Sequence, residues 1–194
     1  MASISREQVR QLVEQALSEF APETSGGSPQ PFSGMPGVLK PGAAKRVAIG
    51  SDHGGFALKR RLKEVLAEAG YEAVDVGTHS QESCDYPDFA IKVGQQIQAG
   101  ACRFGVMIDG AGIGSAMALN KMRGVRAATV HNEATATNSR EHNDANVLVL
   151  GSAQLHPGHA SRILKIWLRT DHSGGRHARR VAKIDALDDL PPRA

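Results

Sequence analysis

The chain has 194 residues, enough for one domain of ordinary size with a short appendage. Apolar residues make up 41% of the chain and charged residues 22%, which excludes a disordered, collagen-like or disulfide-dense protein. The net charge is only +3 and the one dense basic run lies near the C-terminus, so the sequence disfavours a nucleic-acid-binding surface. We expect small-molecule ligands instead.

The sequence also carries signals for cellular location. Cys84 and Cys102 are the only cysteines, and no apolar stretch approaches the roughly 20 residues needed to span a bilayer. The N-terminus lacks a basic segment followed by a hydrophobic one. We therefore expect a cytoplasmic protein with reduced thiols and no membrane anchor.

Residues 1–20 have the pattern of one amphipathic helix. Ser5 and Gln8 have the spacing of a capping box at its start. Its apolar positions recur at helical spacing and are Val9, Leu12, Val13, Ala16, Leu17 and Phe20. Residues 21–45 follow with five prolines and five glycines, a composition typical of a linker. The sequence thus predicts a tethered helix over 1–20, a linker over 21–45 and a domain over 46–194.

From residue 46 onward, short β-branched runs alternate with segments of helical periodicity. The predicted strands cover residues 47–50, 73–76, 104–108, 125–130 and 147–150. The predicted helices cover residues 56–69, 88–99, 112–121, 133–142 and 157–168, and a C-terminal helix carries residues 174–180. This alternation predicts an α/β fold, a three-layer sandwich around a five-stranded parallel sheet. Such sheets bind ligands at the carboxyl ends of their strands.

The first predicted strand is followed by Asp52 and His53, which places a carboxylate and an imidazole at that edge of the sheet. Two glycines come next and allow a ligand to approach the backbone closely. We therefore regard Asp52 and His53 as candidate site residues. The alternative is that Asp52 only caps the following helix and His53 is a surface residue.

The third predicted strand ends at Asp109 and is followed by a glycine loop that opens a helix. The loop consists of Gly110, Ala111, Gly112, Ile113 and Gly114. Its backbone amides and the helix dipole predict a binding site for an anion, either a phosphate or an oxyanion formed during a reaction. The dinucleotide fingerprint fails because Ser115 stands where it needs glycine. A tight turn without a ligand remains the alternative.

His142 lies beside Asn143 at the end of the fourth predicted unit. This histidine suits an acid/base role with a tautomer set by a neighbour, although a helix cap explains the same residues. The histidines show no zinc spacing and neither cysteine belongs to a CxxC motif, so we predict no metal.

Arg176 and Arg180 lie four residues apart on one face of the C-terminal helix, so both guanidinium groups can bind one phosphate. A solvent-exposed basic helix face or a nucleic-acid-binding segment would contain the same run of arginines. The preceding Gly174 and Gly175 favour an anion site.

Together these motifs resemble the ribose-5-phosphate isomerase B family, which includes galactose-6-phosphate isomerase. The resemblance runs from about residue 46 to about residue 186 and rests on SDHGGFALK (51–59), DYPDFA (85–90), GAGIGSAMALNK (110–121), GVRAA (124–128), SREHNDANVLVLG (139–151) and GGRHARR (174–180). It implies a Rossmann-like (flavodoxin-like) sandwich and a homodimer or dimer of dimers. It also implies that a phosphorylated aldose and ketose are interconverted through an enediol without a cofactor.

The resemblance implies a role for each candidate residue. Asp52 and His53 would bind sugar hydroxyls and phosphate, His142 would open the sugar ring, and Asn143 would assist binding. Arg176 and Arg180 would hold the phosphate. The amides from Gly110 to Gly114 would stabilise the enediolate oxygen. Since the family's pocket lies at a subunit boundary, His142 and the arginines would meet Asp52 and Asp109 across it.

The chain departs from the family at the base. Asp109 stands where many members have a cysteine, and Ser115 stands where others have a glutamate. Asp109 is thus the candidate base, although a carboxylate is a weaker base than a thiolate. We expect a slower isomerase, one with a more acidic substrate proton, or a catalytically impaired sugar-phosphate-binding homologue. Alanines at 111, 134 and 153 replace a usual threonine, tyrosine and arginine, which suggests a different sugar or a reshaped pocket.

The N-terminal extension is absent from ordinary members. A short amphipathic helix on a Pro/Gly linker resembles the encapsulation peptides that direct cargo to bacterial microcompartments. Such a helix is marginally stable alone and needs a partner surface, here a shell protein. The alternatives are docking on its own domain, oligomer contacts, or a membrane surface, which its mixed charges disfavour.

Overall fold

The computed structural model describes residues 39–190, which all belong to the second of two units into which the chain divides, residues 34–194. The expected helix over 1–20 and most of the expected linker over 21–45 lie outside the described residues. The strands are β1 (Arg46–Ser51), β2 (Glu72–Asp75), β3 (Phe104–Asp109), β4 (Ala127–Thr129) and β5 (Val147–Gly151). The α-helices are α2 (Phe56–Glu68), α3 (Tyr86–Gln98), α4 (Ile113–Leu119), α5 (Glu133–Glu141), α6 (Pro157–Arg169) and α7 (Gly175–Asp185), with 3-10 turns η1 (Ala43–Lys45) and η2 (Ala186–Asp189).

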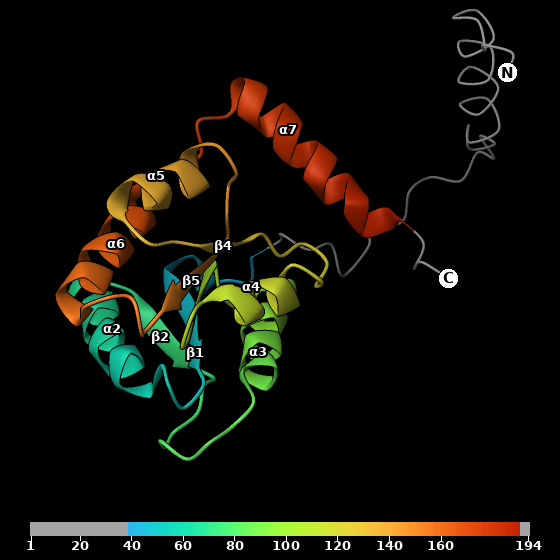
Figure 1. Ribbon diagram of the computed structural model, residues 1–194. Coiled ribbons are helices and arrows are strands. Elements are labelled where there is room, and N and C mark those ends of the chain that lie inside the picture. Colours follow the sequence, from blue (N-terminus) through green and yellow to red (C-terminus); the bar gives the residue numbers. More distant parts are fainter. Residues whose placement is uncertain (1–38, 191–194) are drawn as a thin grey trace, which may run out of the picture. The chain divides into compact units, whose positions relative to one another are not determined.

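The strands form one parallel sheet with the order β2-β1-β3-β5-β4 (Figure 1). The predicted α/β sandwich is thus confirmed, and within residues 39–190 every predicted strand and helix is present with its ends shifted by a few residues. Compared with the flavodoxin order 2-1-3-4-5, the last two strands have exchanged places.

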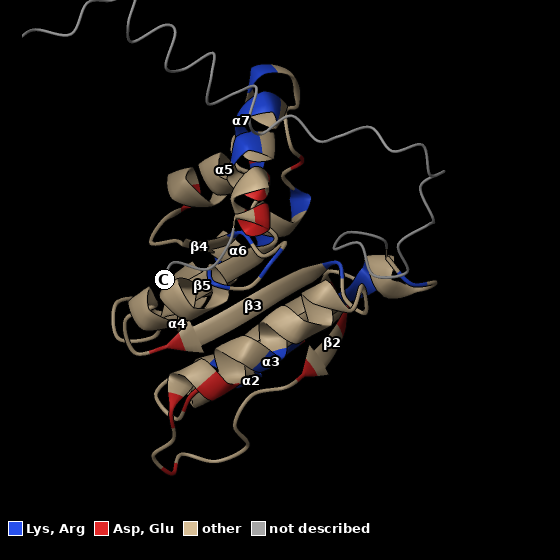
Figure 2. Cartoon of the chain, turned by 90° about the vertical axis from the view of Figure 1, so that its right-hand side faces the viewer, with Lys and Arg blue, Asp and Glu red and all other residues tan. Residues whose placement is uncertain are grey.

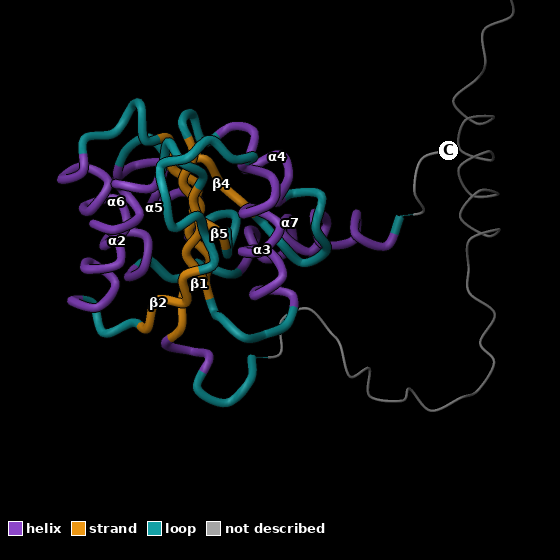
Figure 3. Tube along the Cα trace, turned by 90° about the horizontal axis from the view of Figure 1, so that it is seen from below, coloured by secondary structure: helices purple, strands orange, loops and turns teal. Residues whose placement is uncertain are grey.

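Helices α2, α5 and α6 cover one face of the sheet and α3 and α4 cover the other, which gives the three layers seen in Figure 3. Alternate residues of the central strands face opposite layers. Val47 and Ile49 of β1 pack in the first core, and Ala48 packs in the second. The first core also contains Trp167 of α6, whose ring meets Phe104 edge-on at 4.9 Å between centroids. Since both faces are covered, β1, β3 and β5 are almost completely buried.

The direction of the chain across the sheet explains the layers. Crossovers between parallel strands are right-handed. The direction in which the chain moves along the sheet to its next strand therefore decides which face of the sheet the connecting helix covers. The chain leaves β1 for α2 on one face, and it leaves β3 for α4 on the other. The loops after β1 and β3 therefore diverge, the arrangement that in open α/β sheets forms a ligand-binding crevice.

Both edge strands are short, β2 with four residues and β4 with three. On the outer edge of β4, the side-chain amide of Asn120 donates to the carbonyl of Ala127 at 2.9 Å and accepts from its N–H group at 2.8 Å. Asn120 thus satisfies the backbone groups that an adjoining strand would otherwise bind.

Residues just before the first strand contact the rest of the domain. Lys40 donates its backbone N–H to Gly100 at 2.9 Å, and Ala43 is buried. Within residues 39–190, none of the helices combines the length and apolarity needed to cross a membrane.

Candidate functional site

Asp52 and His53 lie directly after β1, at the edge of the sheet where its loop diverges from the loop after β3. The buried Asp52 carboxylate accepts the backbone N–H of Gly55 at 2.9 Å, so it closes the turn that leads into α2. His53 Nδ1 lies 3.2 Å from the backbone nitrogen of Cys84 and 3.3 Å from its carbonyl oxygen. In a neutral ring, accepting the N–H of Cys84 at Nδ1 leaves the proton on Nε2, free to donate to a ligand.

A buried ion pair holds the loop that carries Cys84. Lys59 of α2 is almost fully buried and donates to the Asp75 carboxylate at 2.6 Å and to the carbonyl of Thr78 at 2.7 Å. Lys63 donates to the other oxygen of Asp75 at 2.7 Å. Burial raises the pKa of Asp75, but hydrogen bonds from Lys59 and Lys63 outweigh it and hold the pKa below its ordinary value. The start of the loop is therefore fixed to α2.

The Asp109 carboxylate ends β3 and points into the glycine loop that follows it. One carboxylate oxygen accepts the backbone N–H of Ala111 at 2.9 Å and that of Gly112. The other accepts the N–H of Ser115 at 3.2 Å and its hydroxyl. These four donors match the lone-pair positions of a carboxylate. In this structure the anionic group that these amides bind is the chain's own Asp109 carboxylate.

Gly112 gives the loop its shape. Its φ of +76° lies in the left-handed region, and a Cβ there would press on Gly151 N at 3.1 Å. The amides of Ile113 and Gly114 belong to the first turn of α4 and have no acceptor within that helix.

Ser152 joins the three loops at this edge of the sheet. Its hydroxyl lies 2.9 Å from the carbonyl of Gly54 and 3.0 Å from that of Asp109, and its backbone N–H donates to the carbonyl of Asp109 at 2.8 Å. The loops after β1, β3 and β5 therefore form one connected unit. Sequence reasoning missed the roles of Ser152 and Cys84 in these contacts, because the contacts join residues brought together only by the fold.

His142 occupies the C-cap of α5, in agreement with the structural alternative for this residue. Asn138 donates its side-chain amide to His142 Nδ1 at 2.7 Å, so the neutral ring carries its proton on Nε2. The side chain is 40% exposed. His142 is therefore both a cap and an accessible proton donor.

A second cluster forms around His142 at the start of α7. The His177 ring stacks on His142 with 4.1 Å between centroids and 3° between planes. Arg176 Nε donates to His177 Nε2 at 3.3 Å. Burial lowers the pKa of His177, and the positive charges of His142, Arg176 and Arg180 lower it further.

The two clusters lie at opposite ends of the sheet. Asp109 pairs with Gly151 at the carboxyl end, whereas Gly105 pairs with Val147 at the other, four steps or about 13 Å away. His142 precedes Val147 by five residues, beyond that amino end. Figure 2 shows the same separation between the blue start of α7 and the tip of β3. Within one chain, the structure therefore does not bring His142, Arg176 and Arg180 to Asp52, His53 and Asp109.

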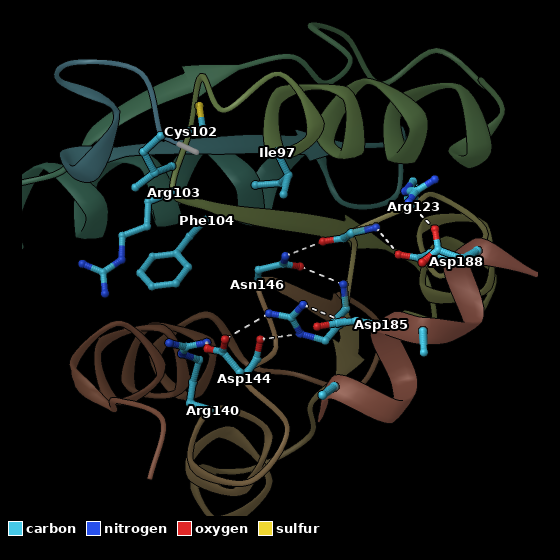
Figure 4. Close-up of a pocket in the computed structure, with 16 residues that line it drawn as sticks. Ile97, Cys102, Arg103, Phe104, Arg123, Arg140, Asp144, Asn146, Asp185 and Asp188 are labelled. Carbon is cyan, nitrogen blue, oxygen red and sulfur yellow. Dashed lines mark hydrogen bonds and ion pairs between the residues drawn. The ribbon is translucent and has the colours of Figure 1, made fainter. Parts of the chain in front are cut away.

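Two cavities flank α7 near this amino end. The first, of about 760 Å³, contains an ion-pair network in which Arg126 bridges Asp144 and Asp185, each at 3.0 Å (Figure 4). Arg140 binds the other oxygen of Asp144 at 2.7 Å. The second, of about 370 Å³, is bordered by Asn143 together with Ile184 and Leu187. The first network anchors the second half of α7 to the domain.

Metal-ligating side chains are dispersed in the part of the chain that the structure describes. Residues 39–190 contain no cluster of three or more His, Cys, Asp or Glu side chains arranged to hold a metal ion. Cys102 is buried, which raises the pKa of its thiol.

Comparison with known proteins places the chain in a family. Residues 47–184 match the model of the family described as Ribose/Galactose Isomerase. The chain belongs to this ribose/galactose isomerase family. Within it, the chain is 41% identical to a putative sugar phosphate isomerase of Bacillus subtilis over 145 residues, 74% of this chain and 97% of that protein. It is 40% identical over 144 residues to ribose-5-phosphate isomerase B of Escherichia coli, covering 74% of this chain and 97% of that protein.

Solved structures of the ribose/galactose isomerase family show the same fold. The Clostridium thermocellum ribose-5-phosphate isomerase B superposes with a TM-score of 0.72 at 47% identity, covering 74% of this chain and 97% of that chain. The family match includes every candidate site residue and leaves residues 1–46 outside it.

Proposed function

We propose that the chain is a cofactor-independent isomerase that interconverts a phosphorylated aldose and ketose through an enediolate. The observation that carries this proposal is the loop after β3, where a carboxylate and convergent backbone amides share one site. Relatives at about 40% identity carry the name ribose-5-phosphate isomerase B, which makes ribose 5-phosphate and related tetrose or pentose phosphates the substrates to test.

The proposed reaction moves one proton between neighbouring carbons. Asp109 takes the proton from C2 of the open-chain aldose, and the C–H electron pair forms the C1–C2 double bond while O1 gains negative charge. Of the amides in the Gly110–Gly114 loop, those of Ala111 and Gly112 donate to Asp109, so the remaining ones would stabilise that oxygen. Return of the proton to C1, with transfer of the O2 proton to O1, gives the ketose.

Asp109 must free a lone pair before it can accept a proton. Three of its four donors are backbone N–H groups fixed by the loop, and the fourth is the Ser115 hydroxyl, which can rotate about its own bond. We assign Ser115 as the donor that yields. Because a carboxylate is intrinsically a weaker base than a thiolate, we expect slower turnover than with a cysteine at this position.

The second cluster would supply ring opening and phosphate binding. His142 Nε2–H would donate to the ring oxygen and open a cyclic sugar, with Asn143 assisting binding. Arg176 and Arg180 would hold the phosphate, since guanidinium groups bind phosphate oxygens in pairs. Asp52 and His53 would bind the sugar hydroxyls and the phosphate at the carboxyl end of β1.

A second copy of the chain is proposed to bring the two clusters together. The separation of the clusters within one chain supports this proposal, and apolar side chains are exposed on α4, beside the first cluster, and beyond the C-terminal end of α7. Ile113 and Met117 of α4 are 55% and 65% exposed, and Leu187 beyond α7 is 61% exposed. We therefore propose a homodimer, or a dimer of dimers, with active sites shared between copies.

Deuterium exchange tests the chemistry. Ribose 5-phosphate, erythrose 4-phosphate and their ketoses are incubated with the protein in heavy water, and incorporation at C1 or C2 is followed by NMR. We expect exchange with at least one pair and its loss in Asp109→Asn. Absence of exchange with all of them would reject the catalytic proposal.

A binding protein without catalysis is the second candidate, favoured by the saturated Asp109 carboxylate. It predicts that sugar phosphates raise the melting temperature of the chain while Asp109→Asn changes no turnover.

Complementation tests the shared site. Asp109→Asn and Arg176→Ala chains are each expected to be inactive. When they are co-expressed, half of the dimers are mixed and each holds one intact site, so about a quarter of the activity should return. Arg179→Ala, on the same helix, serves as the control for charge alone. No recovery would refute a shared site.

For residues 1–20 we propose a role as an encapsulation helix for a microcompartment. Support comes from the apolar periodicity and the linker composition alone. Deleting residues 1–20 should leave the kinetics unchanged and abolish copurification with shell proteins. Changed kinetics with unchanged partners would indicate docking on the chain's own domain.

A further inference from the structure

The start of α7 is joined to the end of α5 by three contacts. The carbonyl of Glu141 accepts the backbone N–H of Ser173 at 3.0 Å and lies 2.9 Å from His172 Nδ1. The third contact is the stack of His177 on His142. The hydrogen bonds fix the backbone of the connection, whereas the stack alone reaches the His142 ring from α7.

His142 is held on two sides. Asn138 fixes the in-plane direction of its ring through Nδ1, and His177 fixes the plane itself, with the two rings only 3° from parallel. The His142 side chain is 40% exposed while His177 is 9% exposed, and the Glu141 carboxylate lies 4.0 Å from His142 Nε2. An exposed side chain at a helix end would otherwise sample several rotamers.

We propose that His177 is a positioning residue that holds the His142 ring in the orientation needed to protonate the oxygen of a cyclic sugar. This inference rests on the proposed function, in which His142 opens the ring. His177 itself needs no contact with substrate for this role. Its Nε2 accepts from Arg176, so the same side chain also links the orientation of His142 to that of a phosphate-binding arginine.

The charge state of His177 agrees with this role. Burial, His142, Arg176 and Arg180 all lower its pKa, which keeps the ring neutral beside a group that must carry and release a proton. A neutral aromatic ring stacks without the repulsion that a second imidazolium would create.

The proposal predicts a selective defect. Isomerisation of ribose 5-phosphate starts from a ring, whereas exchange of the C1 proton of ribulose 5-phosphate starts from an open chain, because its C5 oxygen is esterified. In His177→Ala, we expect ring-dependent isomerisation to fall about tenfold or more and open-chain exchange to change less than about twofold, because misorientation affects only the step that uses His142.

Two matched variants separate stacking from hydrogen bonding. His177→Phe keeps an aromatic plane and removes the acceptor for Arg176, and we expect it to keep the ring-dependent rate within about threefold. His177→Gln keeps a polar acceptor and removes the plane, and we expect it to behave like His177→Ala. The reverse ranking, or equal losses of both reactions in His177→Ala, would overturn the proposal.

An NMR measurement keeps the proposal testable without turnover. The ring current of His177 should shift the Hε1 signal of His142 upfield, so we expect this signal to move downfield in His177→Ala and His177→Gln and to keep its position in His177→Phe. An unmoved signal in His177→Ala would refute the stacking. If the parent chain neither isomerises nor exchanges, the proposed function is wrong, and this signal alone decides the orientation of His142.

Discussion

The buried Lys59–Asp75 pair offers a sharp test of how the site loop is supported. In Asp75→Ala, the Lys59 ammonium keeps only the carbonyl of Thr78 as a partner while it remains buried. Removing one partner of a buried ion pair costs about 3–5 kcal/mol of stability, and the Thr78 contact places the expected loss near the lower limit, about 3 kcal/mol. The cost comes from the charge left behind.

The opposite substitution, Lys59→Met, removes the charge and keeps an unbranched side chain. Asp75 still accepts from Lys63 at 2.7 Å and from the backbone N–H of Gly77 at 3.2 Å. Only the Thr78 carbonyl loses its donor, so we expect a loss of about 1–2 kcal/mol. Lys63→Met is the matched control: this side chain is 41% exposed, and its loss should cost below about 1 kcal/mol.

Urea unfolding at neutral pH and fixed protein concentration measures these differences from the midpoint at constant m. The pH dependence has a defined sign. Because the pKa of Asp75 is lowered in the folded chain, its stabilisation is present above the ordinary aspartate pKa of about 3.9 and is lost as the pH falls further. The difference in free energy of unfolding between the parent chain and Asp75→Ala should therefore become smaller below about pH 4. A Lys59→Met loss equal to or larger than that of Asp75→Ala would refute the reasoning.

Three further predictions concern packing and charge. Gly77→Ala should unfold the chain or cost well over 2 kcal/mol, because a Cβ would overlap the backbone nitrogen of Ser51, whereas Gly158→Ala, with its nearest contact at 3.4 Å, should be nearly neutral by thermal unfolding. Phe104→Ala should cost about 3–5 kcal/mol in the same assay, because it empties the site beside Trp167; a loss below 1 kcal/mol would contradict the packing. The hydrogen bond from His159 lowers the pKa of Glu133 to about 2, so His159→Ala should raise it toward about 4.3 in an NMR titration, and an unchanged value would exclude the pair.

The sequence was sufficient to predict the elements of this fold because each satisfies a local rule. Helical periodicity predicts α2 from residues such as Leu58 and Leu62, which prove to be buried. The order of the sheet was beyond that reasoning. The pairing of β5 with β3 depends on which layer α5 joins, and this is decided by long-range burial of residues such as Ala136.

For the candidate site, position was predictable and orientation was not. The ends of strands place Asp52 and Asp109 at one edge from sequence alone. The direction of the Asp109 carboxylate depends on the left-handed backbone at Gly112 and on Ser115, six residues away. His177 stacks on His142 although the two residues are 35 positions apart, and no sequence periodicity predicts this contact.

The short edges of the sheet determine how copies of this domain are able to associate. Sheet extension needs a run of free N–H and C=O groups on an outer strand. The side chain of Asn120 already occupies those of Ala127 on β4, and β2 offers only four residues that begin and end with an acidic side chain. Neither edge strand therefore serves as a template for the addition of another strand. Contacts between molecules are left to the helical surfaces, which protects a wholly parallel sheet from growing into an aggregate.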